Sequence, residues 1–220
     1  MYYWRLSGFY LFYFASLGAL IPYWGLYLKD LQFTAVQIGE LIGIVMATKI
    51  IAPNIWGWIA DHTGKRMFIV RIASLLAAVA FAGVFIAQGY WWMALVMMLF
   101  SFFWNAALPQ FEVTTLNHLG ADTHRYSSIR LWGSIGFIVA VAGLGSLFER
   151  TGTGILPVVL LVLFAGIWIA SLLVPERGTF HPAVDDVDVR VQTSLFEPYG
   201  PVVVSFLVEL IRVAVSRLID

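Results

Sequence analysis

The chain has 220 residues, of which 60% are hydrophobic, 16% aromatic and only 12% charged. Soluble domains carry about twice that share of charged residues, so a water-soluble fold of this size would expose too much apolar surface. The formal net charge is zero, which gives no support to a nucleic-acid partner, and the lack of cysteine excludes disulfides and thiolate metal sites. A lipid bilayer is the solvent that fits this composition.

Six segments reach the roughly 20 residues that a membrane-spanning helix needs. They are expected at residues 6–28, 38–60, 68–87, 91–112, 131–148 and 155–174. Because a single helix satisfies its own backbone groups in lipid, they predict an all-α membrane protein, a six-transmembrane-helix bundle. We expect short connections, except after the fourth and sixth segments. The first segment is too long for a cleaved signal peptide, so we expect it to be retained.

Basic residues are unevenly distributed between the two ends of the predicted spans. Those on the side of the amino terminus are Arg5, Lys65, Arg66, Arg71, Arg125, Arg130, Arg177 and Arg190, against Lys29 and Arg150 on the other side. Since cytoplasmic loops carry the excess of Lys and Arg, we expect a cytoplasmic amino terminus. The protein is therefore predicted to be a multi-pass protein of the inner (plasma) membrane.

Small residues recur in three of the spans at spacings that let helices approach closely. They are Gly39 and Gly43 in the second, Ala73 and Ala77 in the third, and Gly133, Gly136, Ala140 and Gly143 in the fifth. We expect ordinary helix packing at all of these positions.

Charged side chains inside the spans are candidates for function, because a bilayer penalises them. Lys49 lies about 11 residues from either end of its span, so it either lines a polar cavity or forms an ion pair that pins the bundle. Glu112 and Arg130 each lie nine residues from Ala121, which gives them equal depth in an antiparallel helix pair. A carboxylate that loses a guanidinium partner to a solute takes up a proton more readily, as proton symport requires. The alternative for Arg130 is a plain interfacial arginine.

Polar side chains accompany these charges. Asn105 precedes Glu112 by two helical turns on the same face, and together with Asn54 and Gln110 it is a candidate for hydrogen bonds to a solute. Structural packing explains each of the three equally well. Nothing indicates an enzyme: the histidines fall in or beside loops without metal-ligand spacing, and no cofactor motif is present.

The connection between the second and third spans carries more chemistry than a simple turn needs. Its pattern is Gly57-x-x-x-Asp61-x-x-Gly64-Lys65-Arg66. The glycines permit a tight reversal with positive φ, and Asp61 is expected to accept hydrogen bonds from amides at a helix start. The two cations favour the cytoplasmic side. The pattern closely resembles the signature loop between helices 2 and 3 of the major facilitator superfamily, in which it would act as a conformational switch.

Two further stretches, IPYWGLYLK at 21–29 and IRLWGSIGF at 129–137, resemble the phenylpropionate-permease branch of that superfamily, which is akin to the lactose and nucleoside proton symporters. The resemblance covers residues 6 to about 174. It implies the amino-terminal half of a twelve-helix major facilitator fold, with a central solute cavity and alternating access. It also implies that Glu112 and Arg130 match the acid and arginine that bind solute, and that Lys49 occupies a site often basic in this branch.

The expected organisation is a six-helix transmembrane bundle at 1–175, a cytoplasmic linker at 176–200 and an amphipathic or aberrant seventh helix at 201–220. Carriers of this superfamily have two six-helix halves, whereas this sequence predicts only the first. We therefore expect a truncated product or a fragment. The predicted function is secondary active transport, the proton-coupled uptake of a small organic solute such as an aromatic acid, sugar or nucleoside. Its expected partners are the solute, the proton, the lipid bilayer and a complementary six-helix half, with no cofactor. The alternative is a non-transporting membrane protein or an assembly subunit.

Overall fold

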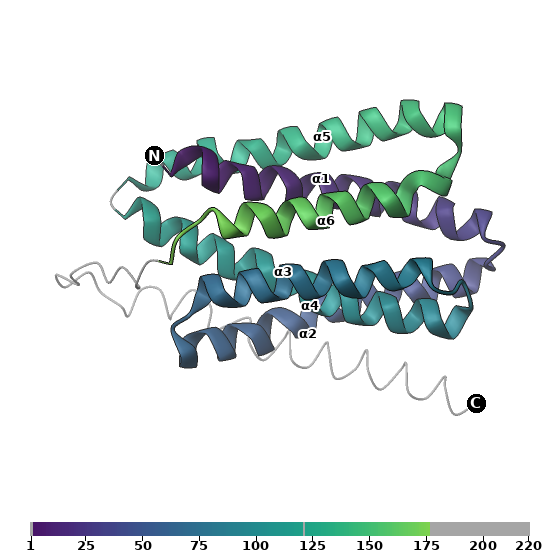
Figure 1. Cartoon of the computed structure of the whole chain (residues 1–220), viewed down its shortest axis with the longest axis horizontal. Helices are drawn as coiled ribbons and strands as arrows, with labels where there is room; N and C mark the ends of the chain where they lie inside the picture. The colour runs from purple at the N-terminus through teal and green to yellow at the C-terminus, as the bar shows by residue number, and fades with distance from the viewer. Residues whose placement is uncertain (1, 121, 177–220) are drawn as a thin grey trace, which may run out of the picture. The chain divides into compact units, whose positions relative to one another are not determined.

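The computed structural model describes residues 2–120 and 122–176, and the structural statements below concern these residues (Figure 1). Their long helices are α1 (Tyr3–Asp30), α2 (Ala35–Thr63), α3 (Arg66–Ala82), α4 (Tyr90–Leu119), α5 (Tyr126–Thr151) and α6 (Leu156–Leu172). Short 3-10 turns, η1 (Gly83–Phe85), η2 (Thr123–Arg125) and η3 (Thr153–Ile155), extend α3 and lead into α5 and α6. With these turns, six helices are long and apolar enough to cross a membrane, which confirms the predicted bundle.

The predicted linker at 176–200, apart from its first residue, and the predicted segment at 201–220 lie outside the described residues. Glu176 marks the end of the described part. Its carboxylate accepts a hydrogen bond of 3.1 Å from the backbone N–H of Met67, in the first turn of α3. A negative charge at a helix start is favourable, so this contact ties the chain after α6 to the base of α3.

The helices run beyond the apolar segments that predicted them, most of all between α4 and α5. α4 continues to Leu119 and α5 begins at Tyr126, so the long loop expected here is wrong. The reason is local hydrogen bonding. The hydroxyls of Thr114 and Thr115, although polar, donate to carbonyls four residues earlier, at 2.9 Å each. Such side chains lower the hydropathy of a segment without ending its helix.

Capping residues fix both ends of α2. The Thr34 side chain accepts from the Gln37 backbone N–H at 3.3 Å, and the Thr34 backbone N–H donates to the Gln37 side chain at 3.0 Å. This is a capping box, which satisfies amide groups that have no partner inside the helix. At the other end Gly64 adopts φ 66°, a conformation that strains any residue with a side chain, and closes the helix.

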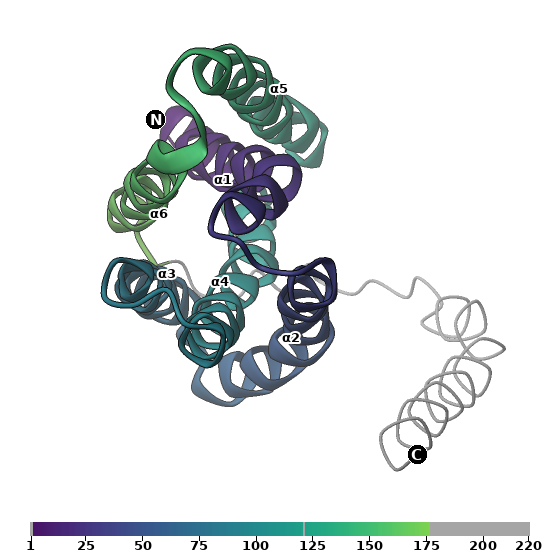
Figure 2. The ribbon, with the colours of Figure 1, turned by 90° about the vertical axis from the view of Figure 1, so that its right-hand side faces the viewer.

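The helices form two groups, seen end-on in Figure 2. α1 packs mainly against α5 and α6, α4 packs mainly against α2 and α3, and α3 also packs against α6. In the most apolar 18-residue window of each helix, half of the residues of α1 and α4 are buried, against 22% for α2 and 17% for α5. α1 and α4 therefore form the core, whereas α2 and α5 present the most open faces.

Stacked aromatic rings hold α1 against α4. The rings of Phe9 and Phe111 stack with centroids 3.7 Å apart, and one turn later Tyr13 stacks on Trp104 at 5.0 Å. These four side chains are almost fully buried. Aromatic pairs of this kind contribute about 0.5–1.5 kcal/mol beyond the area they bury, so they fix the two central helices in register.

Glycines bring α5 into direct backbone contact with α1. A Cβ placed at Gly136 would lie 2.3 Å from the Leu11 carbonyl oxygen, and one at Gly18 would lie 2.7 Å from the Phe137 carbonyl oxygen. Neither backbone oxygen can move aside cheaply. The expected close packing is therefore present at Gly136.

Other small residues divide between packing and open positions. Ala73 and Ala77 in α3 are fully buried, as expected. A Cβ at Gly39, Gly43 or Gly143 would meet nothing within 4 Å in the described part of the chain. The expectation of helix packing at these three glycines is therefore wrong within the bundle, because each lies on an outward face of α2 or α5.

Candidate functional site

A cavity of about 290 Å³ lies between α1, α2, α4 and α5. Its wall is mostly apolar and carries four aromatic side chains, Tyr13, Phe14, Trp24 and Trp104. Three polar side chains, Lys49, Asn105 and Arg130, also line it, each from a different helix. An apolar hollow with a few convergent polar groups is typical of a small-molecule site. The sequence had singled out these three residues as candidates for contact with solute or proton.

Lys49 is the central residue of the 29-residue α2, and its side chain is exposed where it lines the cavity. Within residues 2–120 and 122–176 it forms no ion pair. The interpretation of Lys49 as a pin of the bundle therefore finds no acidic partner there. The geometry agrees with the interpretation in which Lys49 faces a cavity.

Asn105 belongs to a chain of hydrogen bonds between α4 and α2. Its side-chain amide donates to the Thr48 hydroxyl at 3.3 Å, which donates to the Ser101 hydroxyl at 2.7 Å. The Ser101 hydroxyl in turn donates to the Met97 carbonyl at 2.6 Å. Because all three polar side chains are buried and bonded, the chain holds α2 to α4 directly beside Lys49.

Glu112 and Arg130 meet, as their equal spacing from the turn predicts. Nε of Arg130 is 3.8 Å from Oε1 of Glu112, and their side chains are 32% and 37% exposed, respectively. This distance makes an ion pair without a close hydrogen bond. Arg130 lies in the cavity wall, which is not where a plain interfacial arginine would be expected. The pair thus joins a carboxylate to a guanidinium that lines the cavity.

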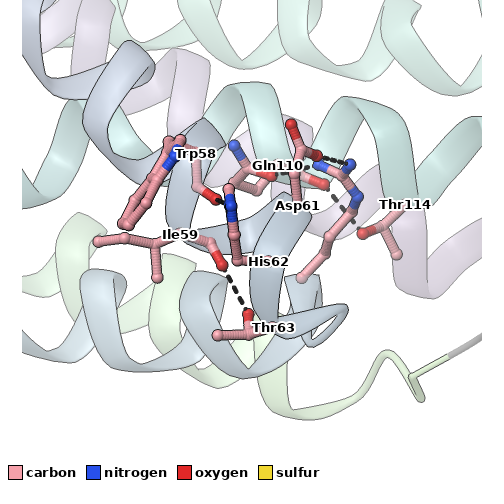
Figure 3. Close-up of polar contacts among 8 residues, drawn as sticks. Trp58, Ile59, Asp61, His62, Thr63, Gln110 and Thr114 are labelled. Atoms are coloured by element: carbon pink, nitrogen blue, oxygen red, sulfur yellow. Dashed lines mark hydrogen bonds and ion pairs between the residues drawn. The ribbon is translucent and has the colours of Figure 1, made fainter.

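The loop between α2 and α3 is fastened to α4 through Arg66, the first residue of α3. Its guanidinium pairs with Asp61 through Nη2 and donates through Nη1 to the Gln110 side-chain oxygen at 2.6 Å. Figure 3 shows Asp61 close to Gln110. It also shows the Thr114 hydroxyl, which donates to the backbone carbonyl of Gln110. Asp61 lies in the last turn of α2. Asp61 is thus at a helix end and binds the Arg66 side chain, so the expectation that it caps a helix start is wrong.

The two glycines of the loop pattern have different roles. Gly64, with φ 66°, makes the reversal, and Lys65 follows as the exposed N-cap residue of α3. Gly57 lies inside α2, so the expected positive φ is absent there. A Cβ at Gly57 would lie 3.7 Å from the Gln110 side-chain nitrogen, which shows how near α4 passes.

Two residues for which the sequence left solute contact and structural packing as alternatives do not line the cavity. Gln110 binds Arg66 instead, and the Asn54 amide donates to the Ile50 carbonyl of its own helix at 3.0 Å. Conversely, sequence reasoning missed Phe14, which lines the cavity, and Thr48, which accepts a hydrogen bond from Asn105. A signal for Thr48 was its place next to Lys49. Phe14 had no distinguishing signal within an aromatic-rich span.

The fold and the cavity define a multi-pass membrane protein with a hollow of small-molecule size inside its helices. The sequence matches the MFS_1 like family over residues 3–207, and the chain belongs to this family. Its members are membrane transporters of the major facilitator superfamily rather than enzymes.

Several relatives match part of their length. The chain is 30% identical over 143 residues to a maltose permease of Geobacillus stearothermophilus, covering 64% of this chain and 36% of that protein. It is 30% identical over 144 residues to a probable 3-phenylpropionic acid transporter of Escherichia coli (strain K12), covering 63% and 36%. The structure of the nucleoside transporter NupG superposes with a TM-score of 0.75 at 18% identity, covering 94% of this chain and 52% of that one. That likeness concerns the fold alone, and the chain spans about a third to a half of these relatives.

Proposed function

We propose that the chain is the amino-terminal half of a secondary active transporter that couples uptake of a small organic solute to protons by alternating access. The observation that carries this proposal is the cavity wall that gathers Lys49, Asn105 and Arg130, with Glu112 3.8 Å from Arg130. Ionisable groups at membrane depth are costly, and they characteristically mark solute and ion pathways. Membership of a transporter family supports the same function.

Among aromatic acids, sugars and nucleosides, the charges favour an aromatic monocarboxylate. Arg130 and Glu112 offset each other, whereas Lys49 has no acidic partner in the described part of the chain. The cavity therefore carries about one uncompensated positive charge, which a solute carboxylate would neutralise in this low-dielectric setting. The aromatic wall suits a phenyl ring. The name of one relative, a probable 3-phenylpropionic acid transporter, agrees with this solute class.

Coupling follows from competition for Arg130. A solute carboxylate that binds the guanidinium draws it from Glu112. A carboxylate that loses its guanidinium partner binds a proton more readily, so Glu112 is the proposed carrier of the coupled proton. The solute and the proton then cross together, and Glu112 returns the proton when Arg130 rejoins it. Arg66, which joins the signature loop to α4, is the residue through which that loop would follow the change in the bundle.

A complementary six-helix half is the proposed partner. α2 and α5 are the least buried helices, and Lys49 and Arg130 lie on them. A second half on this side would shield those charges from lipid and complete the cavity, and rocking of the halves would alternate its access. The excess of Lys and Arg on the amino-terminal side supports a cytoplasmic amino terminus in an inner membrane.

The proposal is tested by uptake of 3-phenylpropionate into membrane vesicles that contain the chain, with and without an imposed proton gradient. We expect gradient-driven accumulation, and we expect Glu112→Gln to abolish it because an amide carries no proton. Glu149→Gln is the matched control, since Glu149 is exposed near the end of α5 and does not line the cavity. Accumulation that survives Glu112→Gln would exclude Glu112 from coupling, and no accumulation with the unaltered chain would contradict transport by this chain without a complementary half.

A further inference from the structure

The Arg130 guanidinium lies over an aromatic ring. Its central carbon is 3.8 Å from the centroid of the Phe14 ring and 5.6 Å from that of Tyr10, one turn earlier on α1. Nε of Arg130 is also 3.8 Å from Glu112, which is too long for a good hydrogen bond. A cation over a ring face at this distance is a cation–π contact. Arg130 therefore divides its interactions between a ring on α1 and a carboxylate on α4.

We propose that Phe14 is a positioning residue for Arg130: its ring holds the guanidinium in the cavity wall and keeps it from closing onto Glu112. This inference rests on the proposed function, in which Arg130 binds a solute carboxylate. A stacked guanidinium uses its face and keeps the N–H donors of its edge available. Those edge donors are the ones that bind a carboxylate in bidentate fashion.

Without the ring, the nearest opposite charge is Glu112. Opposite unit charges 3.8 Å apart attract each other, so a guanidinium without the ring would close onto the carboxylate and form a tight pair. A tight pair would occupy the donors that the solute needs. The contact with Phe14 thus keeps the pair between Arg130 and Glu112 loose, so that a solute carboxylate can take the place of Glu112.

Gly133 provides the room for this stack. It lies one turn after Arg130 on α5, and a Cβ there would be 2.7 Å from Cδ2 of Phe14 and 3.0 Å from Nη1 of Arg130. Any side chain at this position would push the ring, the guanidinium or both out of the contact. Gly143, farther along the same helix, has nothing within 4 Å of its Cβ position and serves as its control.

The first test needs no solute. Protons above a ring face are shielded, so the full chain in nanodiscs should show a shielded arginine side-chain resonance that disappears in Arg130→Gln. We expect this resonance to lose its shielding in Phe14→Leu, which keeps an apolar side chain, and to keep it in Phe14→Tyr, which restores a ring face. Gly133→Ala should also lose it, and Gly143→Ala should keep it. An Arg130 resonance that is unchanged in Phe14→Leu would overturn the proposal.

The second test separates positioning from packing. Binding of 3-phenylpropionate is compared with binding of its neutral amide, 3-phenylpropionamide. Phe14→Leu should weaken carboxylate binding roughly three- to tenfold more than it weakens amide binding, and Phe14→Tyr should restore the preference for the carboxylate. Equal weakening of both probes would mean that Phe14 only packs against the solute, which would overturn the proposal. If the unaltered chain binds neither probe, the proposed solute class fails, and the resonance test still decides the role of Phe14.

Discussion

A positive charge in the middle of a membrane helix persists when a nearby group or water lowers its energy. Lys49 is at the centre of α2, and the part of the chain that the structure describes offers it no carboxylate. What it does have is a cavity that also contains Arg130. The two cations, Lys49 and Arg130, outnumber the single carboxylate of Glu112. This excess of positive charge attracts an anion and is the physical basis for the proposed carboxylate solute.

Replacement of Lys49 by glutamine should therefore weaken the binding of 3-phenylpropionate roughly tenfold or more, because a charged hydrogen bond is lost in a poorly hydrated site. Stability should fall little, since Lys49 forms no ion pair in the described bundle. Equilibrium dialysis of the chain in nanodiscs measures the affinity. The control is Lys29→Gln, at an exposed position near the end of α1 and away from the cavity. Equal affinities of the two variants would remove Lys49 from the site.

Sequence reasoning reached Lys49, Glu112 and Arg130 because charge and depth in a span are visible without a structure. It did not reach Phe14, because one phenylalanine among many aromatic residues has no distinguishing mark. For Gln110 the sequence left a contact with solute and a structural contact as alternatives, and the side chain binds Arg66. Which way a polar side chain turns depends on the neighbouring helix, and that information is absent from a single span.

Between helices, α5 and α1 are in direct backbone contact. Gly136 faces the Leu11 carbonyl with no space for a methyl group, and Gly133 faces Phe14. Helices in lipid gain little from the hydrophobic effect, so close packing of this kind supplies much of their attraction. The contact between α5 and α1 also positions Arg130, on α5, beside α1.

Gly136→Ala should accordingly destabilise the bundle by about 1–3 kcal/mol, because the added methyl group overpacks two backbones that are already in contact. Unfolding by sodium dodecyl sulfate, followed by circular dichroism, provides the measurement. Gly143→Ala, on the same helix but in open space, should be neutral or slightly stabilising, since alanine is the better helix former. Equal unfolding midpoints for the two variants would contradict the described contact.

Hydropathy predicted the existence and order of the helices but not their ends. The boundary between α4 and α5 was missed because buried threonines bond to their own helix and continue it through polar sequence. The small-residue pattern was correct for Gly136 and wrong for Gly39 and Gly43, since spacing alone does not tell an inward face from an outward one. Similarly, the turn chemistry was correct for Gly64 and wrong for Gly57, which lies inside a helix.

The bundle as a unit has one closed core and one open side. α1 and α4 fill the core with stacked rings, while α2 and α5 leave their faces open and carry Lys49 and Arg130. A cavity that serves a solute has to be reached by water and filled by the solute. A face that contacts lipid is neither reached by water nor filled by the solute. The reactivity of single cysteines toward a water-soluble reagent therefore distinguishes a cavity position from a lipid-facing position.

The cysteine-free sequence makes this distinction measurable with single cysteines. Met46 lines the cavity and is 47% exposed, whereas Met98 is equally exposed, at 45%, but lies outside the cavity wall. Thiols react as thiolates, which form in water and not in lipid. In nanodiscs, a water-soluble maleimide should label Met46→Cys faster than Met98→Cys, and excess 3-phenylpropionate should slow only the former. Equal labelling of the two cysteines, or a Met46→Cys rate that the solute leaves unchanged, would contradict a solute site in this cavity.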